Sequence, residues 1–195
     1  MACRSPQIIR LILSIGFSLL AASCNHSSSC KIDCSQFREG DIILRKGRGL
    51  ISDLIVSSLK DTLPYSHCGI LVSEKNEWKV IHSIARELSD ADGVQICSLN
   101  RFLADCDRQC YMIVRSRSAT AGLQIAKAAR YYVGQNIPFD YQFNLADSSA
   151  FYCSELPIHI LKYHCKIPIN YSDKRIPFSL FTDTTYFRVI TTHRD

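Results

Sequence analysis

The stretch YSHCGILVSEKNEWKVIHS, residues 65–83, holds two short apolar runs separated by the polar residues EKNE. Each run has the length of a strand and the polar residues between them are typical of a turn, so the stretch predicts a β-hairpin. If the hairpin turns at Lys75 and Asn76, the numbers of paired residues sum to 151. In that register His82 lies opposite Gly69.

The two histidines of this hairpin are predicted to share one face of the sheet. Side chains alternate along a strand, so His67, Gly69 and His82 point the same way, and Gly69 leaves room between the two rings. His67 is a candidate general base, and His82 is a candidate for orienting it. The alternative is that His67 is a hydrogen-bonded structural residue. Cys68 points to the opposite face and is predicted to be an outward-facing bystander.

The remaining elements predict an α+β fold. Short strands are expected at 42–44, within 93–98, at 110–116 and within 185–193, and helices at 50–59 and 120–134. The elements do not alternate regularly as βαβ units. This order favours a mainly antiparallel sheet packed against helices.

A candidate nucleophile lies at the predicted start of a late helix. In FYCSEL, Cys153 precedes Pro157, a residue that fits only the first turn of a helix. Backbone N–H groups at a helix start favour the thiolate and can hold an oxyanion. The alternative is a buried or disulfide-bonded cysteine.

The N-terminal segment has the pattern of an export signal. Two arginines precede a short apolar run, and LLAASC resembles a lipoprotein box ending at Cys24. We therefore expect a signal peptide at 1–23, a lipidated Cys24 with a polar tether over 24–36, and a catalytic domain over 37–195. The protein is then exported to the cell envelope and held at the membrane by a lipid anchor. The alternative is a plain cleaved signal.

Charge and cysteine content limit the other function classes. The net charge of +5 is too small to indicate nucleic-acid binding, and no basic cluster is interleaved with aromatic residues. Ten cysteines in an exported chain suggest local pairs, Cys30 with Cys34 and Cys106 with Cys110. Their spacing also falls within that of zinc ligands, but neither pair is followed by a second half-site, so no metal is assigned.

Several ordered motifs resemble one enzyme family. GDIIL, YSHCGILV, WKVIHS, YYVGQNIPFDYQF and FYCSEL together are similar to the YiiX/YaeF-type permuted papain-like amidases, over about residues 39–189. The resemblance implies a circularly permuted papain-like (NlpC-like) fold and a dyad of Cys153 and His67. Close relatives place a glutamate at the third position, where this chain has His82. Tyr65 and Tyr152 are candidates for the oxyanion or substrate wall.

The sequence thus predicts a secreted cysteine hydrolase that cleaves an amide bond through a thioester. The expected substrates are cell-wall peptides or N-acyl amides, and the chemistry requires no metal or organic cofactor. One alternative is a lipid-directed acyltransferase or esterase that uses the same dyad. Another is a non-catalytic binding module stapled by disulfides, and the oligomeric state stays open.

Overall fold

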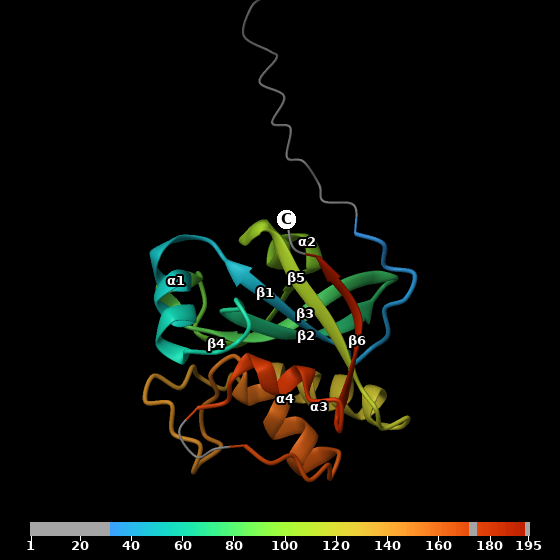
Figure 1. Ribbon diagram of the computed structural model, residues 1–195. Helices are drawn as coiled ribbons and strands as arrows, with labels where there is room; N and C mark the ends of the chain where they lie inside the picture. The colour runs from blue at the N-terminus through green and yellow to red at the C-terminus, as the bar shows by residue number, and fades with distance from the viewer. Residues whose placement is uncertain (1–31, 172–174, 194–195) are drawn as a thin grey trace, which may run out of the picture.

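The computed structural model describes residues 32–171 and 175–193, and it contains a six-stranded sheet with helices on both faces (Figure 1). The strands lie in the order β4-β3-β2-β1-β5-β6, and all neighbours are antiparallel. They are β1 (Ile42–Gly47), β2 (His67–Glu74), β3 (Glu77–Ile84), β4 (Gly93–Ser98), β5 (Cys106–Ser116) and β6 (Phe187–His193). The predicted α+β class is therefore confirmed.

The helices match the sequence pattern closely. They are α1 (Gly49–Leu59), α2 (Leu99–Ala104), α3 (Ala121–Gly134) and α4 (Glu155–His159), with the short turns η1 (Arg86–Leu88) and η3 (Phe178–Thr182). The late helix that the sequence predicts continues from α4 as the segment η2 (Ile160–His164), whose π-helical form was not predicted. No helix within the described ranges has the length and apolarity needed to cross a membrane.

The β2–β3 hairpin has the register that the sequence predicts. Ile70 pairs with Ile81, and the ladder continues to Glu74 and Glu77. Lys75 and Asn76 form the turn, and both have positive φ. Two consecutive positive φ angles are the geometry of a two-residue type I′ turn, which matches the twist of the strands and fixes their pairing.

Two apolar clusters lie on opposite faces of the sheet. The larger one joins the sheet to α3, α4 and η2, which lie together below the sheet in Figure 1. The smaller one contains Leu71, Val80 and Ile113 from the sheet together with Leu99 and Phe102 of α2. Side chains of successive strand residues thus enter different clusters, and both faces of the central strands are buried.

The loop before α4 is held against the sheet. Phe139 forms a parallel bridge with Phe151, and the Ser83 hydroxyl of β3 donates a hydrogen bond of 2.5 Å to the Phe151 carbonyl. This contact fixes the chain two residues before Cys153. The position of that cysteine is therefore set by strand β3 as well as by its own helix.

The expected cysteine pair on β5 is not a disulfide. Neither Cys106 nor Cys110 is in a disulfide, and the Cys106 thiol donates to the Cys110 carbonyl oxygen at 3.2 Å. Cys34 is also free, while its expected partner Cys30 lies outside the described residues, as does the predicted lipidation site Cys24.

Candidate active site

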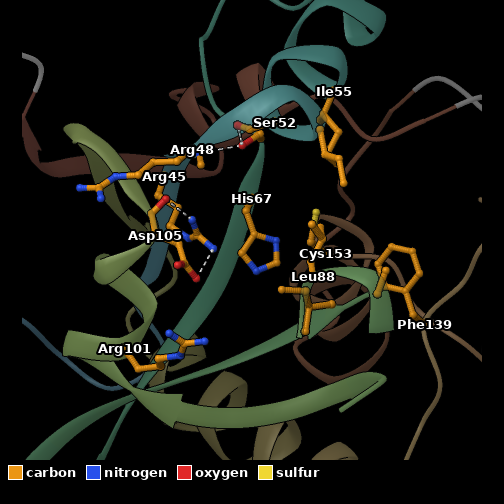
Figure 2. A pocket seen from close by; sticks show the side chains of 15 residues that line it. Arg45, Arg48, Ser52, Ile55, His67, Leu88, Arg101, Asp105, Phe139 and Cys153 are labelled. Carbon is orange, nitrogen blue, oxygen red and sulfur yellow. Dashed lines mark hydrogen bonds and ion pairs between the residues drawn. The ribbon is translucent and has the colours of Figure 1, made fainter. Parts of the chain in front are cut away.

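His67 and Cys153 line the same cavity, which has a volume of about 260 Å³. His67 is the first residue of β2, and Cys153 lies two residues before α4, so both come from the ends of elements. Figure 2 shows the His67 ring and the Cys153 side chain, both of which line this cavity. Residues 86 positions apart in the chain thus line one cavity, at the end of a central strand of the sheet.

The His67 and His82 side chains are in direct contact. His67 Nε2 lies 2.8 Å from His82 Nδ1, and both rings are buried. A Cβ atom at Gly69 would lie 2.4 Å from Val80 Cγ1 and 3.1 Å from His82 Cβ. The glycine therefore provides the space that the hairpin register requires between the two strands.

Cys97 of β4 extends this contact into a short chain. Its sulfur lies 3.4 Å from His82 Nε2, and burial raises the pKa of Cys97 to about 11, so the group stays a neutral thiol. If His82 donates from Nε2 to this sulfur, its Nδ1 accepts from His67 Nε2–H. Nδ1 of His67 is then the basic nitrogen available to Cys153. Cys97 was not among the residues predicted from the sequence, although the β3–β4 pairing places it near His82.

Both histidines are held in their neutral forms. Burial lowers the pKa of His67 well below its usual value, and the positive charge of Arg45 and the His82 ring lower it further. Burial and Arg45 lower the pKa of His82 to about 3. The Phe102 ring packs against both imidazoles, and Arg45 lies over the same ring at 4.9 Å. A neutral His67 can accept a proton, as a general base must.

The half-buried Cys153 thiol differs from the two histidines, because hydrogen-bond donors have the main effect on its pKa. A hydrogen bond from the Cys68 thiol lowers the pKa of Cys153, and backbone N–H groups, including that of Ser154, lower it further against the effect of burial. Each donor stabilises the thiolate, which is the nucleophilic form.

The prediction that Cys68 is an outward-facing bystander is wrong. Alternation does place Cys68 on the face opposite His67, but that face packs on the helices, and Cys68 is fully buried there. Its sulfur lies 3.2 Å from the carbonyl oxygen of Cys153. Burial and the contact with Cys153 raise the pKa of Cys68, so it remains a thiol that donates.

The two tyrosines predicted for the wall lie in different places. Tyr65 is fully buried in the larger core cluster and is not among the residues lining the cavity. Tyr152 borders a neighbouring groove, and its hydroxyl accepts a hydrogen bond from the Ile176 N–H at 3.0 Å. Its own N–H donates to the Glu155 carboxyl group, whose pKa is raised to about 8 by burial.

An apolar groove of about 370 Å³ meets the cavity at Cys153. This volume is in the range of small-molecule sites. The cavity and the groove share Cys153, Ser66, Ile51, Ile55 and Phe139. Further apolar side chains line the groove: Leu54, Leu59, Phe143, Tyr152, Ile176 and Phe178. Arg175, the one charged side chain among the described residues that line the groove, stacks on the Phe143 ring at 4.7 Å.

No group of three or more His, Cys, Asp or Glu side chains in the described part of the chain is arranged to hold a metal ion. The cavity instead combines a thiol with a lowered pKa and a neutral imidazole.

The fold is that of a papain-like cysteine hydrolase in circularly permuted order. Residues 36–176 match the family described as permuted papain-like amidase enzyme, YaeF/YiiX. The chain belongs to this family, as its motifs predicted.

Among solved structures, the chain is similar to that described as metalloprotein yiiX from Escherichia coli O157:H7. The TM-score is 0.67 at 18% identity, and the match covers 82% of this chain and 99% of the other. At this identity the likeness concerns the fold. No curated protein matches the chain.

Proposed function

We propose that this protein hydrolyses the amide bond of N-acyl substrates through a thioester on Cys153, with His67 as general base and His82 as the residue that positions it. One observation carries the proposal: His67 lines the same cavity as Cys153, and His82 contacts His67 at 2.8 Å. Covalent catalysis requires a nucleophile, a base and an orienting group close together, and these two contacts support that assignment.

The reaction has two stages. His67 Nδ1 takes the Cys153 proton, and the sulfur attacks the substrate carbonyl while the Cys153 backbone N–H donates to the oxyanion. His67 then gives the proton to the departing amine, leaving the acyl group on sulfur. Water enters, loses a proton to His67 and attacks the thioester. The carboxylic acid leaves, and the thiol is restored.

The apolar groove favours an acyl chain over a cell-wall peptide. Its lining is mostly aliphatic and aromatic, and it includes the proposed nucleophile Cys153. On α1, Leu50 and Leu54 are 74% and 56% exposed, and Leu54 borders the groove. A hydrocarbon chain gains from burial in such a groove, whereas a polar peptide would lose hydration without replacement.

Product analysis by mass spectrometry tests this function. Purified protein is incubated with long-chain N-acyl amides, the matching esters and cell-wall peptide fragments, with Cys153→Ala as the control. Release of a free fatty acid from the amides, absent in the control, is the expected result. Cleavage of the peptide fragments alone would refute the acyl assignment, and acyl transfer to an added alcohol in place of water would support the acyltransferase alternative.

The solved structure to which this chain is similar is described as a metalloprotein, so the activity must also be measured without metal. The proposed steps use only Cys153, His67, His82 and backbone groups. The activity is therefore expected to be unchanged after treatment with a chelator. Loss of activity with recovery on adding one metal would contradict the proposed mechanism.

We also propose that the enzyme works at the cell envelope, anchored through Cys24. The support is the LLAASC box after a basic and apolar segment. The exposed apolar side chains of α1 beside the groove are compatible with work at a lipid surface. Incorporation of labelled fatty acid that disappears in Cys24→Ala is the expected result, and a cytoplasmic, unlabelled protein would contradict it.

A further inference from the structure

The wall of the cavity opposite the apolar groove is positively charged. Arg45, Arg48 and Arg101 line the cavity, and Asp105 is the single acidic residue among the lining residues. None of the three arginines lines the groove. Figure 2 shows Arg45, Arg101 and Asp105 on the far side of His67 from Phe139. We refer to the three arginines as the cationic wall.

The charge of this wall is only partly compensated. Arg45 Nη1 donates to the Asp105 carbonyl oxygen at 2.8 Å, and its Nη2 lies 3.8 Å from the Asp105 carboxylate. The Arg45 side chain is 7% exposed, yet its Nε is buried without a hydrogen-bond partner among the described residues. A buried donor without a partner is costly, and a ligand that supplies an acceptor removes that cost. Arg48 and Arg101 are exposed; Arg48 Nε donates to the uncharged Cys106 carbonyl oxygen at 3.0 Å, so its positive charge is not neutralised by this contact.

The position of His67 indicates where the amine and the acyl chain of the substrate lie, one in the cavity and the other in the groove. His67 lines the cavity with the cationic wall but does not line the groove. In the proposed reaction the departing amine must receive its proton from His67, so the amine lies on the side of the arginines. The acyl group stays on Cys153, which borders the groove, so its chain lies in the groove.

We propose that the amine part of the substrate carries an anionic group, a carboxylate or a phosphate, and that the cationic wall binds it. The substrate class is then an N-acyl amino acid or an N-acyl phosphoamine with an apolar acyl chain. Guanidinium groups suit both anions, because they offer paired N–H donors in the geometry of two oxygens. This inference rests on the proposed function and assigns to the same site its charge preference.

The first test compares three substrates with the same acyl chain. N-dodecanoylglycine carries a carboxylate, N-dodecanoyl-phosphoethanolamine carries a phosphate, and N-dodecanoylglycinamide is neutral and nearly isosteric with the first. We expect at least one anionic substrate to exceed the neutral one in kcat/KM by about tenfold or more, the size of a charge-assisted hydrogen bond. The anionic substrate with the higher kcat/KM shows whether the wall prefers a carboxylate or a phosphate. Equal values for all three would overturn the inference and leave the proposed function intact.

Variants of the wall identify its residues. In the double variant Arg48→Gln and Arg101→Gln, the preference for the anionic over the neutral substrate is expected to fall, mainly through a higher KM for the anionic substrate. Arg188→Gln is the matched control, because Arg188 is exposed on β6 and does not line the cavity. An unchanged preference in the double variant, or an equal loss in the control, would contradict the assignment.

Binding to Cys153→Ala protein separates this inference from the proposed function. Calorimetry is expected to show tighter binding of an anionic ligand than of N-dodecanoylglycinamide, and the difference should disappear with the two arginine substitutions. If this preference is found but no substrate is hydrolysed by the natural chain, the anion site stands and the hydrolase proposal fails. Absence of any preference in binding overturns the inference, whatever the activity.

Discussion

The two faces of strand β2 affect the two members of the proposed dyad in different ways: one face surrounds His67, and the other contacts Cys153. On one face, His67 lies among His82, Phe102 and Arg45, where burial and a positive charge keep the imidazole neutral. On the other face, Cys68 lies in the larger core beside Cys153, and a side-chain hydrogen bond from its thiol lowers the pKa of the nucleophile. The base is tuned by desolvation and the thiol by hydrogen bonding, so the two effects can be removed separately.

The largest effect is expected on the His67 face. His67→Ala removes the general base and should lower kcat/KM for an N-acyl amide by about 10²–10⁴-fold. His193→Ala provides a control, because His193 lies at the end of β6 and does not line the cavity. A His67→Ala enzyme with nearly full activity would remove this histidine from the mechanism.

A smaller loss is expected for the positioning residue on the same face. His82→Ala leaves His67 Nε2 buried without its partner and should lower kcat by about 10- to 100-fold. His82→Gln keeps a group that can accept a hydrogen bond and should recover part of the activity, with a changed pH profile. Equal activity of both variants would indicate that His82 only fills space.

The Cys68 face is tested by the reactivity of the thiol. Cys68→Ala removes the leading cause of the lowered Cys153 pKa, so the pH profile of Cys153 alkylation should move to higher pH. At neutral pH the reaction should slow by roughly tenfold. Cys68→Ser retains a donor and should move the profile less. An unchanged profile in Cys68→Ala would contradict the claim that hydrogen bonding from the Cys68 face lowers the Cys153 pKa.

The sequence predicted the His67 face better than the Cys68 face, for a physical reason. A hairpin with a two-residue turn has a register that follows from local residues, so the Ile70–Ile81 pairing and the contact of the two histidines could be derived. The contact of Cys68 with Cys153 depends on how a distant helix packs on the sheet. Alternation along β2 identifies the face of Cys68 but does not say what covers that face.

The cationic wall was missed for the same reason. Arg45, Arg48 and Arg101 lie on β1, before α1 and on α2, and only the tertiary structure brings them together beside His67. Each is an ordinary charged residue in the sequence. Cys97 is an intermediate case, since its place beside His82 follows from the β3–β4 register once that pairing is known.

The smallest effect concerns stability near the nucleophile. Burial raises the pKa of Glu155 to about 8, above the value of about 4.3 expected in the unfolded chain. The native state therefore binds more protons between these values, and the free energy of unfolding should fall as pH rises from about 4.3 to about 8.

Glu155→Gln should reduce this fall, as measured by urea denaturation at pH 5 and pH 8. Glu77→Gln, at a side chain that is 73% exposed, should leave the fall unchanged. If Glu155→Gln has the same pH dependence as the natural chain, the carboxyl group is not protonated in the native state.

The pairing of Cys153 with His67 is tested most directly by alkylation of the native protein with iodoacetamide at mildly acidic pH, with each modified cysteine located by mass spectrometry. The account predicts that Cys153 reacts before the other described cysteines, which are Cys34, Cys68, Cys97, Cys106, Cys110 and Cys165, and that His67→Ala slows its reaction. Modification of Cys153 at the same rate as Cys34, or at a rate unaffected by His67→Ala, would contradict it.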